Sequence, residues 1–185
     1  VLETHEKRRW QTTNERVTNR LLILLNGIAS GIRNGLGIPP DIVDERIFKT
    51  GNIEAINKEV MRATLEIVFP AIYQQVLLLR EESWRRLAGN LQNADHQVIA
   101  FLDMFQNRLS PDQISTLLDI QEKLEHSLIF YQTFPDLAGV PKDKLPKTRT
   151  PPDVLQQHGY ESTASHLQRT IELCSKLSSA SRVIA

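Results

Sequence analysis

The apolar positions of this chain recur at helical spacing, and no segment alternates between apolar and polar residues as a β-strand does. Near the N-terminus one apolar face advances by seven, four, three, four and four residues, which predicts a helix over residues 4–32. The sequence NGLGIPP should end this helix, because glycine frees the backbone and paired prolines cannot continue it. The face consists of Trp10, Val17, Leu21, Leu24, Ile28 and Ile32.

Two further helical elements are expected before the middle of the chain. The first is short and covers residues 41–52, and the second covers residues 53–79. Pro70 lies inside the apolar spacing of the second element. Because proline removes a backbone hydrogen bond and clashes with the preceding turn, we expect a kink in a long helix there.

A helical hairpin is predicted in the second half of the chain. Its first helix, over residues 80–109, contains Gly89, which leaves two alternatives: a continuous helix, or a break with Asp95 as the N-cap of the second part. The sequence SPDQ then marks the start of another helix, with Ser110 as N-cap and Pro111 in the first turn. Because so few residues separate the two helices, they should pack antiparallel.

The last part of the chain is expected to be a linker and one more helix. Residues 135–152 include five prolines and predict an extended, partly polyproline-like connector whose few apolar residues contact the surface. A C-terminal helix follows within 153–185; its apolar spacing predicts that it runs from about Tyr160 to Ser181. The fold class is therefore all-α, a single domain built as an antiparallel bundle of four to six helices, with residues 1–134 forming the bundle.

Composition narrows the functional classes. Lys plus Arg and Asp plus Glu number 22 each, and this balance disfavours a dedicated nucleic-acid-binding protein. Cys174 is the only cysteine, so no internal disulfide forms and a reducing compartment is expected. The longest apolar stretch, residues 21–32, is shorter than the roughly 18–20 residues that a membrane span needs.

The basic cluster EKRRW near the N-terminus points to a membrane-proximal position. Lys7, Arg8 and Arg9 oppose the helix dipole if the helix begins beside them, and this mismatch disappears if the helix begins upstream. A basic cluster beside a Trp is also typical of the cytoplasmic side of a membrane span. The layout resembles prokaryotic proteins of uncharacterised role that carry one or two N-terminal spans before a soluble helical domain. The resemblance implies a cytoplasmic domain, tethered to the inner face of the membrane through residues upstream of Val1.

The leading functional hypothesis is a non-catalytic interaction or sensory domain. Amphipathic helix faces would bind a protein partner or a second copy of the chain. The residues expected to form this interaction surface are Trp10, Val17, Leu21 and Leu24.

The alternative hypothesis is a helical metal-binding protein or enzyme. Glu122 and His126 are four residues apart and share a helix face, and Glu125 adjoins His126. His96 is a further candidate ligand. The chain lacks the paired Glu-x-x-His motifs of di-iron bundles and any His-x-x-x-His pair.

Other catalytic signals are weaker. The sequence SASHLQRT resembles the phosphoacceptor box of sensor histidine kinases and implies a phosphorylated His166, but Leu167 replaces the acidic neighbour and Ile171 replaces the proline. We expect Cys174 to be an inert core thiol. No Gly-x-Gly-x-x-Gly or Walker motif occurs, so we expect no bound cofactor. Three glycines spaced by four residues, at 27, 31 and 35, could let two helices approach closely or could mark a fraying helix end, and we expect the second.

Overall fold

The protein is described here by a computed structural model, which covers residues 2–38, 69–147 and 151–183. The predicted element over 41–52 and most of the predicted helix over 53–79 lie outside the described residues. The described α-helices are α1 (Leu2–Leu36), α4 (Phe69–Leu78), α5 (Glu81–Phe105), α6 (Pro111–Thr133) and α7 (Pro152–Val183).

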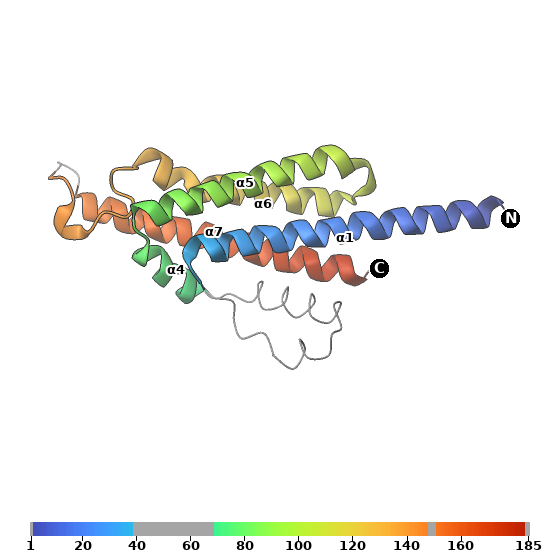
Figure 1. The fold of residues 1–185 in the computed structure, drawn as a ribbon, viewed down its shortest axis with the longest axis horizontal. Coiled ribbons are helices and arrows are strands. Elements are labelled where there is room, and N and C mark those ends of the chain that lie inside the picture. Colours follow the sequence, from blue (N-terminus) through green and yellow to red (C-terminus); the bar gives the residue numbers. More distant parts are fainter. Residues whose placement is uncertain (1, 39–68, 148–150, 184–185) are drawn as a thin grey trace.

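Four of these helices form a closed antiparallel bundle (Figure 1). Helix α1 packs on α5, α5 on α6, α6 on α7, and α7 returns to α1, while the short helix α4 packs along α7. Successive helices of the bundle run in opposite directions, so each one neighbours two antiparallel partners. The prediction of an all-α antiparallel bundle is confirmed.

Helix α1 is the longest element, with 35 residues, and its N-terminal part extends past the end of the bundle (Figure 1). From Val17 onward its apolar face is buried against α5 and α7. Within the described ranges, no helix has both the length and the apolar content that crossing a membrane requires.

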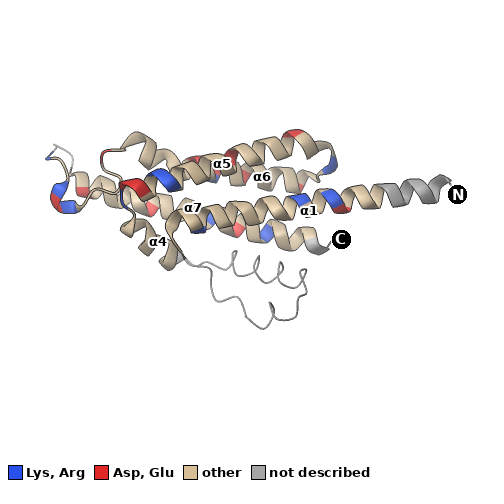
Figure 2. Cartoon of the chain, in the orientation of Figure 1, with Lys and Arg blue, Asp and Glu red and all other residues tan. Residues whose placement is uncertain are grey.

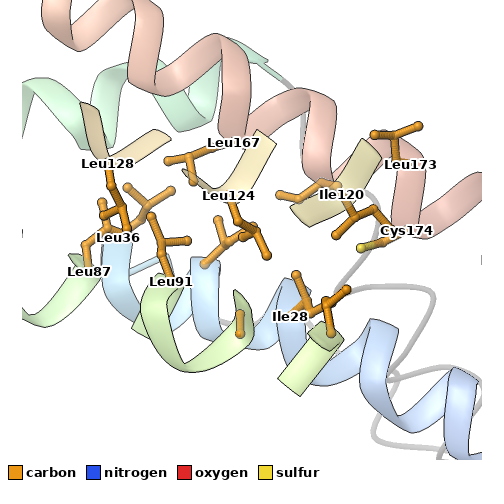
Figure 3. Close-up of a cluster of buried hydrophobic side chains, with 14 of the residues drawn as sticks. Ile28, Leu36, Leu87, Leu91, Ile120, Leu124, Leu128, Leu167, Leu173 and Cys174 are labelled. Carbon is orange, nitrogen blue, oxygen red and sulfur yellow. The ribbon is translucent and has the colours of Figure 1, made fainter. Parts of the chain in front are cut away.

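The core runs along the axis of the bundle and contains side chains from every α-helix described. Aliphatic residues from α1, α5, α6 and α7 point toward one another, and Cys174 lies among them (Figure 3). Burying side chains of this size contributes about 1.5–3 kcal/mol each to folding. The residues labelled in the centre of the core are Ile28, Leu36, Leu87, Leu91, Ile120, Leu124, Leu128, Leu167 and Leu173.

The close contact between α1 and α5 depends on glycines of α1. A Cβ atom at Gly35 would meet the Leu87 side chain and backbone, and Asn90 Nδ2 donates to the Gly31 carbonyl oxygen at 3.0 Å. These residues belong to a helix that continues to Leu36, so the expectation of a fraying helix end is wrong. The small residues allow the two backbones to approach, as in other close helix pairs.

Helix α5 is continuous from Glu81 to Phe105, which decides between the two alternatives for this region. Asp95 is therefore a mid-helix residue and does not cap a second helix. Helix propensity alone disfavours Gly89 by about 1 kcal/mol relative to alanine, and the buried face of the helix offsets this cost. That face consists of Trp84, Leu87, Ala88, Leu91, Ala94, Val98 and Phe101.

The predicted start of α6 is confirmed as a capping box. Gln113 N–H donates to Ser110 Oγ at 3.2 Å, and Ser110 N–H donates to Gln113 Oε1 at 2.9 Å. Pro111 occupies the first turn, where its missing N–H costs nothing. The box fixes where the chain turns back after α5, and so sets how α6 lies against α5.

The segment 135–152 differs from the predicted extended connector. Leu137 and Ala138 are buried in the core, and a short 3-10 turn, η2, covers Lys142–Lys144. Gln156 Nε2 donates to the carbonyl oxygens of Leu137 and Val140, at 2.7 and 2.8 Å. These bonds hold the start of the segment against α7, so this part is a packed element of the fold.

A glycine allows the same segment to approach α5. Gly139 has a φ of +80°, and a Cβ atom there would overlap the backbone between Arg80 and Glu81. Its N–H donates to Tyr160 Oη at 2.9 Å. Helix α7 begins at Pro152, eight residues before the apolar face detected from the sequence, because Pro152 and Asp153 suit a first helical turn.

Charged residues of both signs are spread over the helices (Figure 2). Several pair with a neighbour on their own helix, such as Arg85 with Glu81 at 3.2 Å and Arg169 with Glu172 at 3.1 Å. Exposed pairs of this kind contribute about 0.3–0.5 kcal/mol each. They support the helices on which they lie.

Candidate functional site

A cavity of about 350 Å³ lies between α5 and α6. It is lined by carboxylates, imidazoles and carboxamides together with two aliphatic residues. The α5 positions are one turn apart or less, and the α6 positions follow the same spacing, so both helices present one face to the cavity. The lining residues are Gln92, Asp95, His96, Glu125, His126, Leu128, Ile129 and Gln132.

Among the residues that line this α5–α6 pocket, Asp95 has a buried side-chain oxygen without a hydrogen-bond partner in the described structure. This atom is Oδ1. Burial raises the pKa of the Asp95 carboxyl, and the negative charge of Glu125 raises it further, whereas His96 and Gln121 lower it. Glu125 accepts from Gln121 Nε2 at 3.3 Å. The lining thus brings two carboxylates close enough for Glu125 to raise the pKa of Asp95, and the Asp95 oxygen without a partner is itself closed to solvent.

A second cavity, of about 490 Å³, lies between α4, α7 and the segment after α6. Several of its polar groups hold the fold, and Arg80 and Lys142 also line it. Gln156 binds two carbonyl oxygens of the segment, Tyr160 accepts from Gly139 N–H, and Tyr73 Oη donates to Glu161 Oε1 at 3.5 Å. We therefore assign Tyr73, Gln156 and Tyr160 a structural role.

A third cavity, also of about 490 Å³, lies where α6 begins and α7 ends. Ser110 and Gln113 line it, and both are engaged in the capping box. Thr116 Oγ1 lines it too and donates to the Asp112 carbonyl oxygen at 2.8 Å. Unlike the α5–α6 pocket, this cavity contains no buried polar atom that lacks a partner in the described part of the chain.

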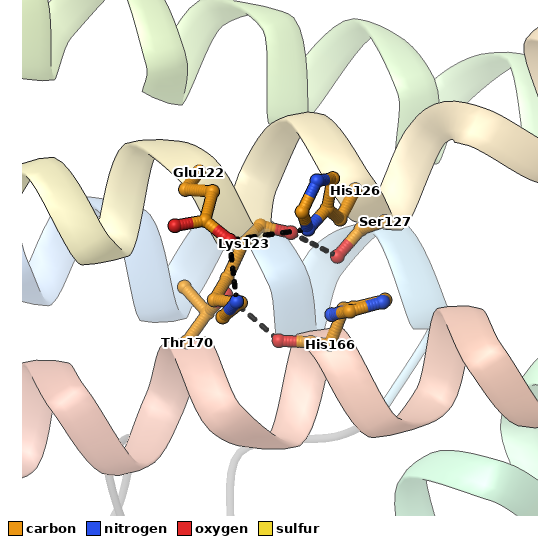
Figure 4. A network of polar contacts seen from close by, with 6 residues as sticks. All are labelled: Glu122, Lys123, His126, Ser127, His166 and Thr170. Atoms are coloured by element: carbon orange, nitrogen blue, oxygen red, sulfur yellow. Dashed lines mark hydrogen bonds and ion pairs between the residues drawn. The ribbon is translucent and has the colours of Figure 1, made fainter.

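A polar network on the seam between α6 and α7 adjoins the pocket through His126 (Figure 4). Glu122 Oε1 lies 2.7 Å from Lys123 Nζ and 3.5 Å from His126 Nδ1. The His126 and His166 rings face each other across the seam with centroids 5.1 Å apart. Burial lowers the pKa of His166, as do His126 and Lys123, and Glu122 opposes them.

Because of the contact between His126 and His166, we expect the free energy of unfolding to fall in mild acid. Because the pKa of His166 is lowered in the folded state, the unfolded chain takes up its proton at higher pH. The free energy of unfolding should fall as pH drops from about 7 through the ordinary histidine range near 6.5. Urea unfolding at pH 7 and pH 5 measures this fall, and His166→Gln should reduce it.

The matched control for this prediction is His158→Gln, on the same helix. The His158 side chain is 75% exposed and lies 3.8 Å from Glu161. Its replacement should leave the pH dependence of stability unchanged. An identical pH dependence in wild type and His166→Gln would show that the histidine pair does not contribute.

The structure does not support the predicted metal site at Glu122, Glu125 and His126. No group of three or more His, Cys, Asp or Glu side chains that could hold a metal ion occurs in the part of the chain that the structure describes. Glu122 bonds Lys123 beside α7, whereas Glu125 bonds Gln121 and faces Asp95 of α5. Glu122 and Glu125 therefore lie on different faces of α6. His96 belongs to α5 and lines the pocket.

The phosphoacceptor resemblance places a reactive histidine at 166. The structure shows this side chain partly buried against His126 and not on an open helix face. Thr170 Oγ1 donates to the His166 backbone oxygen at 2.9 Å, an interaction within the helix. The two departures from the motif, at Leu167 and Ile171, already disfavour phosphorylation of His166.

Three of the four predicted interaction residues are core residues. Val17, Leu21 and Leu24 are buried among the chain's own helices, so they are not available to a partner, and this part of the prediction is corrected. Their spacing identified a buried face, but not the molecule that covers it. Trp10 is 56% exposed, and the Arg108 guanidinium lies 4.3 Å from the centre of its ring.

Sequence reasoning did not identify the α5–α6 pocket, although a signal was present. Each helix of the predicted hairpin contains an acid followed by a histidine, Asp95–His96 in one and Glu125–His126 in the other. Both pairs line the same cavity. The repeated acid–histidine dipeptide in two antiparallel helices was the available clue.

Comparisons with known protein families, with curated proteins and with solved structures find no match to this chain.

Proposed function

We propose that this chain is a non-catalytic helical sensory or interaction domain that binds a small molecule in the α5–α6 pocket. The observation that carries the proposal is the Asp95 carboxyl group, which lines an open cavity although burial and the charge of Glu125 disfavour its ionised form. Asp95 Oδ1 is buried without a partner in the described structure, which costs about 1–3 kcal/mol, so this residue is kept at the expense of stability. Pockets that begin at about 300 Å³ accommodate small molecules.

The accessibility of nucleophilic side chains supports a binding role and not a catalytic one. Cys174 is fully buried in the core, and burial raises the pKa of its thiol to about 12, so it is neither accessible nor ionised at neutral pH. The residues around the α5–α6 pocket include no serine, threonine, cysteine or lysine. Carboxylates, imidazoles and carboxamides are sufficient to orient and bind a polar ligand.

The helix contacts suggest how binding would be transmitted. The pocket lies on the α5–α6 hairpin, and α5 is joined to α1 by the Asn90–Gly31 hydrogen bond and the Gly35–Leu87 contact. A ligand that draws α5 and α6 together would bias the position of α1, which projects beyond the bundle. The proposal includes a protein partner or second copy near Trp10, and a membrane tether upstream of Val1 with the domain on the cytoplasmic side.

The proposal predicts that Asp95 reduces stability, as residues retained for function often do. Because the pKa of Asp95 is raised in the folded state, its ionised form is disfavoured there. Asp95→Asn should therefore raise the urea unfolding midpoint at pH 7. The gain should disappear near pH 3, where the wild-type carboxyl is already protonated in both states.

The control for this comparison is Asp103→Asn, an exposed acid on the same helix. Its effect should lie within about 0.5 kcal/mol of zero. A lower unfolding midpoint for Asp95→Asn at pH 7 would mean that Asp95 holds the fold together, and the functional assignment of the pocket would lose its main support.

A further inference from the structure

We infer that one end of the bundle carries a surface that docks on anionic lipid headgroups. This arginine surface lies where helix α1 meets the end of α5 and the short 3-10 turn η1 (Gln106–Arg108), and its charged groups are Arg16, Arg20 and Arg108. It rests on the proposed function, which places the domain beside a membrane, and it adds which end of the domain faces the lipid and which lipid charge is bound.

Two of these arginines pack on aromatic rings and not on carboxylates. The Arg108 guanidinium lies 4.3 Å from the centre of the Trp10 ring, and the Arg20 guanidinium lies 5.5 Å from the centre of the Phe105 ring. Neither arginine forms an ion pair with any residue that the structure describes. Because a ring positions a guanidinium without cancelling its charge, both charges remain available to an external anion.

Arg16 adds a third exposed charge on the same face of α1. It precedes Arg20 by four residues, so the two share a helix face, and the spacing of seven residues places Arg9 on this face as well. Glu15 is the only acid among residues 7–20, and it lies about 100° around the helix from Arg16. The arginine face of α1 is therefore not interrupted by an acid between Arg9 and Arg20.

The local charge of this end differs from that of the whole chain. Residues 7–20 and 103–112, which the two arginine–ring contacts bring together, contain six basic and three acidic residues, whereas the complete sequence has 22 of each. Figure 2 shows basic residues on α1 and at the turn after α5 at this end of the bundle. A local positive excess on a neutral protein favours docking in one orientation on a negative surface.

The length of the arginine surface favours a layer of headgroups over a single small anion. Trp10 and Arg20 are ten residues apart on α1, which corresponds to about 15 Å along the helix axis. The guanidinium groups near them are too far apart to converge on one phosphate, but each can bind a different headgroup through its planar fork. Trp10 is 56% exposed and is a residue type enriched at membrane interfaces.

The position of this end agrees with the tether of the proposed function. The N-terminal part of α1 extends past the bundle here (Figure 1), so a chain tethered upstream of Val1 presents the arginine surface to the membrane first. A tether holds the surface at a high effective concentration of lipid, so a weak contact is sufficient to orient the domain.

Sedimentation with lipid vesicles tests the inference on the full 185-residue chain. Vesicles of phosphatidylcholine are compared at pH 7 with vesicles in which phosphatidylglycerol replaces one third of the lipid, at about 50 mM and about 500 mM NaCl. The chain should bind the anionic vesicles at low salt and should not bind the neutral ones. High salt should weaken the binding roughly tenfold or more, because it screens exposed charges.

Four arginine variants locate the binding surface. Arg20→Gln and Arg108→Gln should each weaken binding to anionic vesicles roughly fivefold, the contribution of one basic residue near a charged membrane. Arg85→Gln and Arg169→Gln are the matched controls, because they remove the same charge from exposed arginines that pair with an acid on their own helix. These controls should change binding by less than about twofold. Circular dichroism checks that each variant is folded.

Three results would overturn the inference directly. They are equal binding to neutral and anionic vesicles, no binding to either, and equal weakening by all four variants, which would mean that net charge alone sets the affinity. Tighter binding to duplex DNA than to anionic vesicles, with the same dependence on Arg20 and Arg108, would assign the surface to a nucleic acid instead. Stronger displacement by inorganic phosphate than by chloride at matched ionic strength would assign it to a free anion.

These results are distinguishable from failure of the proposed function. Vesicle binding by this chain involves neither the α5–α6 pocket nor residues upstream of Val1, so its absence would remove the arginine surface and leave both other elements standing. The protein partner or second copy expected near Trp10 is measured separately, by the oligomeric state of the chain without vesicles.

Discussion

The variant Leu21→Asp is expected not to fold. Leu21 is fully buried between α1 and the rest of the bundle, and a carboxylate there would have no partner within the core. An uncompensated buried charge costs more than the roughly 5–15 kcal/mol by which a domain of this size is stable. Circular dichroism and amide NMR should show loss of cooperative unfolding and of the dispersed native spectrum.

Ile23→Asp is the matched control for this prediction. Ile23 lies two residues further along α1 and is 70% exposed. Its replacement should change the free energy of unfolding by no more than about 0.5 kcal/mol. If Leu21→Asp remained folded and changed only its oligomeric state, this face of α1 would be an interface and the core described here would be wrong.

The second large effect is expected at Gly159, in the first half of α7. A Cβ atom at this position would overlap the ring of Phe130 on α6. That ring cannot easily move, because it packs edge-on against Trp84 and Tyr160, at 5.9 and 5.5 Å between centroids. Gly159→Ala should therefore destabilise the domain by about 1–3 kcal/mol, the usual cost of overpacking.

Gly89→Ala on α5 is expected to have the opposite sign. Gly89 is an exposed helical residue, and a Cβ atom there would meet no other atom within 4 Å. Alanine should raise stability by about 0.5–1 kcal/mol through helix propensity alone. Urea titrations of both variants give the two signs directly. Stabilisation of both would mean that α6 and α7 are further apart at Phe130 than the structure shows.

Some parts of the fold could be predicted from the sequence. The spacing of Val17, Leu21 and Leu24 predicts a helix with a buried face, and the SPDQ motif locates the start of α6 to the residue. Both are local properties, since periodicity and capping involve residues within one or two turns. The all-α bundle follows from several such helices with short connections.

Features that depend on contacts between residues distant in the sequence could not be predicted from local patterns. Gly89 and Gly159 look equivalent in the sequence, and only the ring of Phe130 distinguishes them. The start of α7 at Pro152 was missed because its first turn lacks a strong apolar face. The burial of Leu137 depends on Gln156 and on the left-handed Gly139, which no local pattern in the connector reveals.

The candidate site illustrates the same difference. The sequence drew attention to Glu125 and His126 but assigned them to a metal, because it could not show which helix faces them. The register of α5 against α6 places Asp95 opposite Glu125 and separates Glu122 from both. Register between helices is set by core packing along their whole length, so it becomes visible only in the folded structure.

The measurement that tests the central claim most directly is an unbiased map of small-molecule binding on the whole chain. A fragment library spanning cationic, neutral and anionic compounds is screened against the ¹⁵N-labelled protein, and each hit is located by its amide shifts. The account predicts that hits concentrate on residues 92–96 and 125–132, around the α5–α6 pocket. Hits that concentrate instead at the cavity between α4 and α7, or an absence of hits at the α5–α6 pocket, would contradict it.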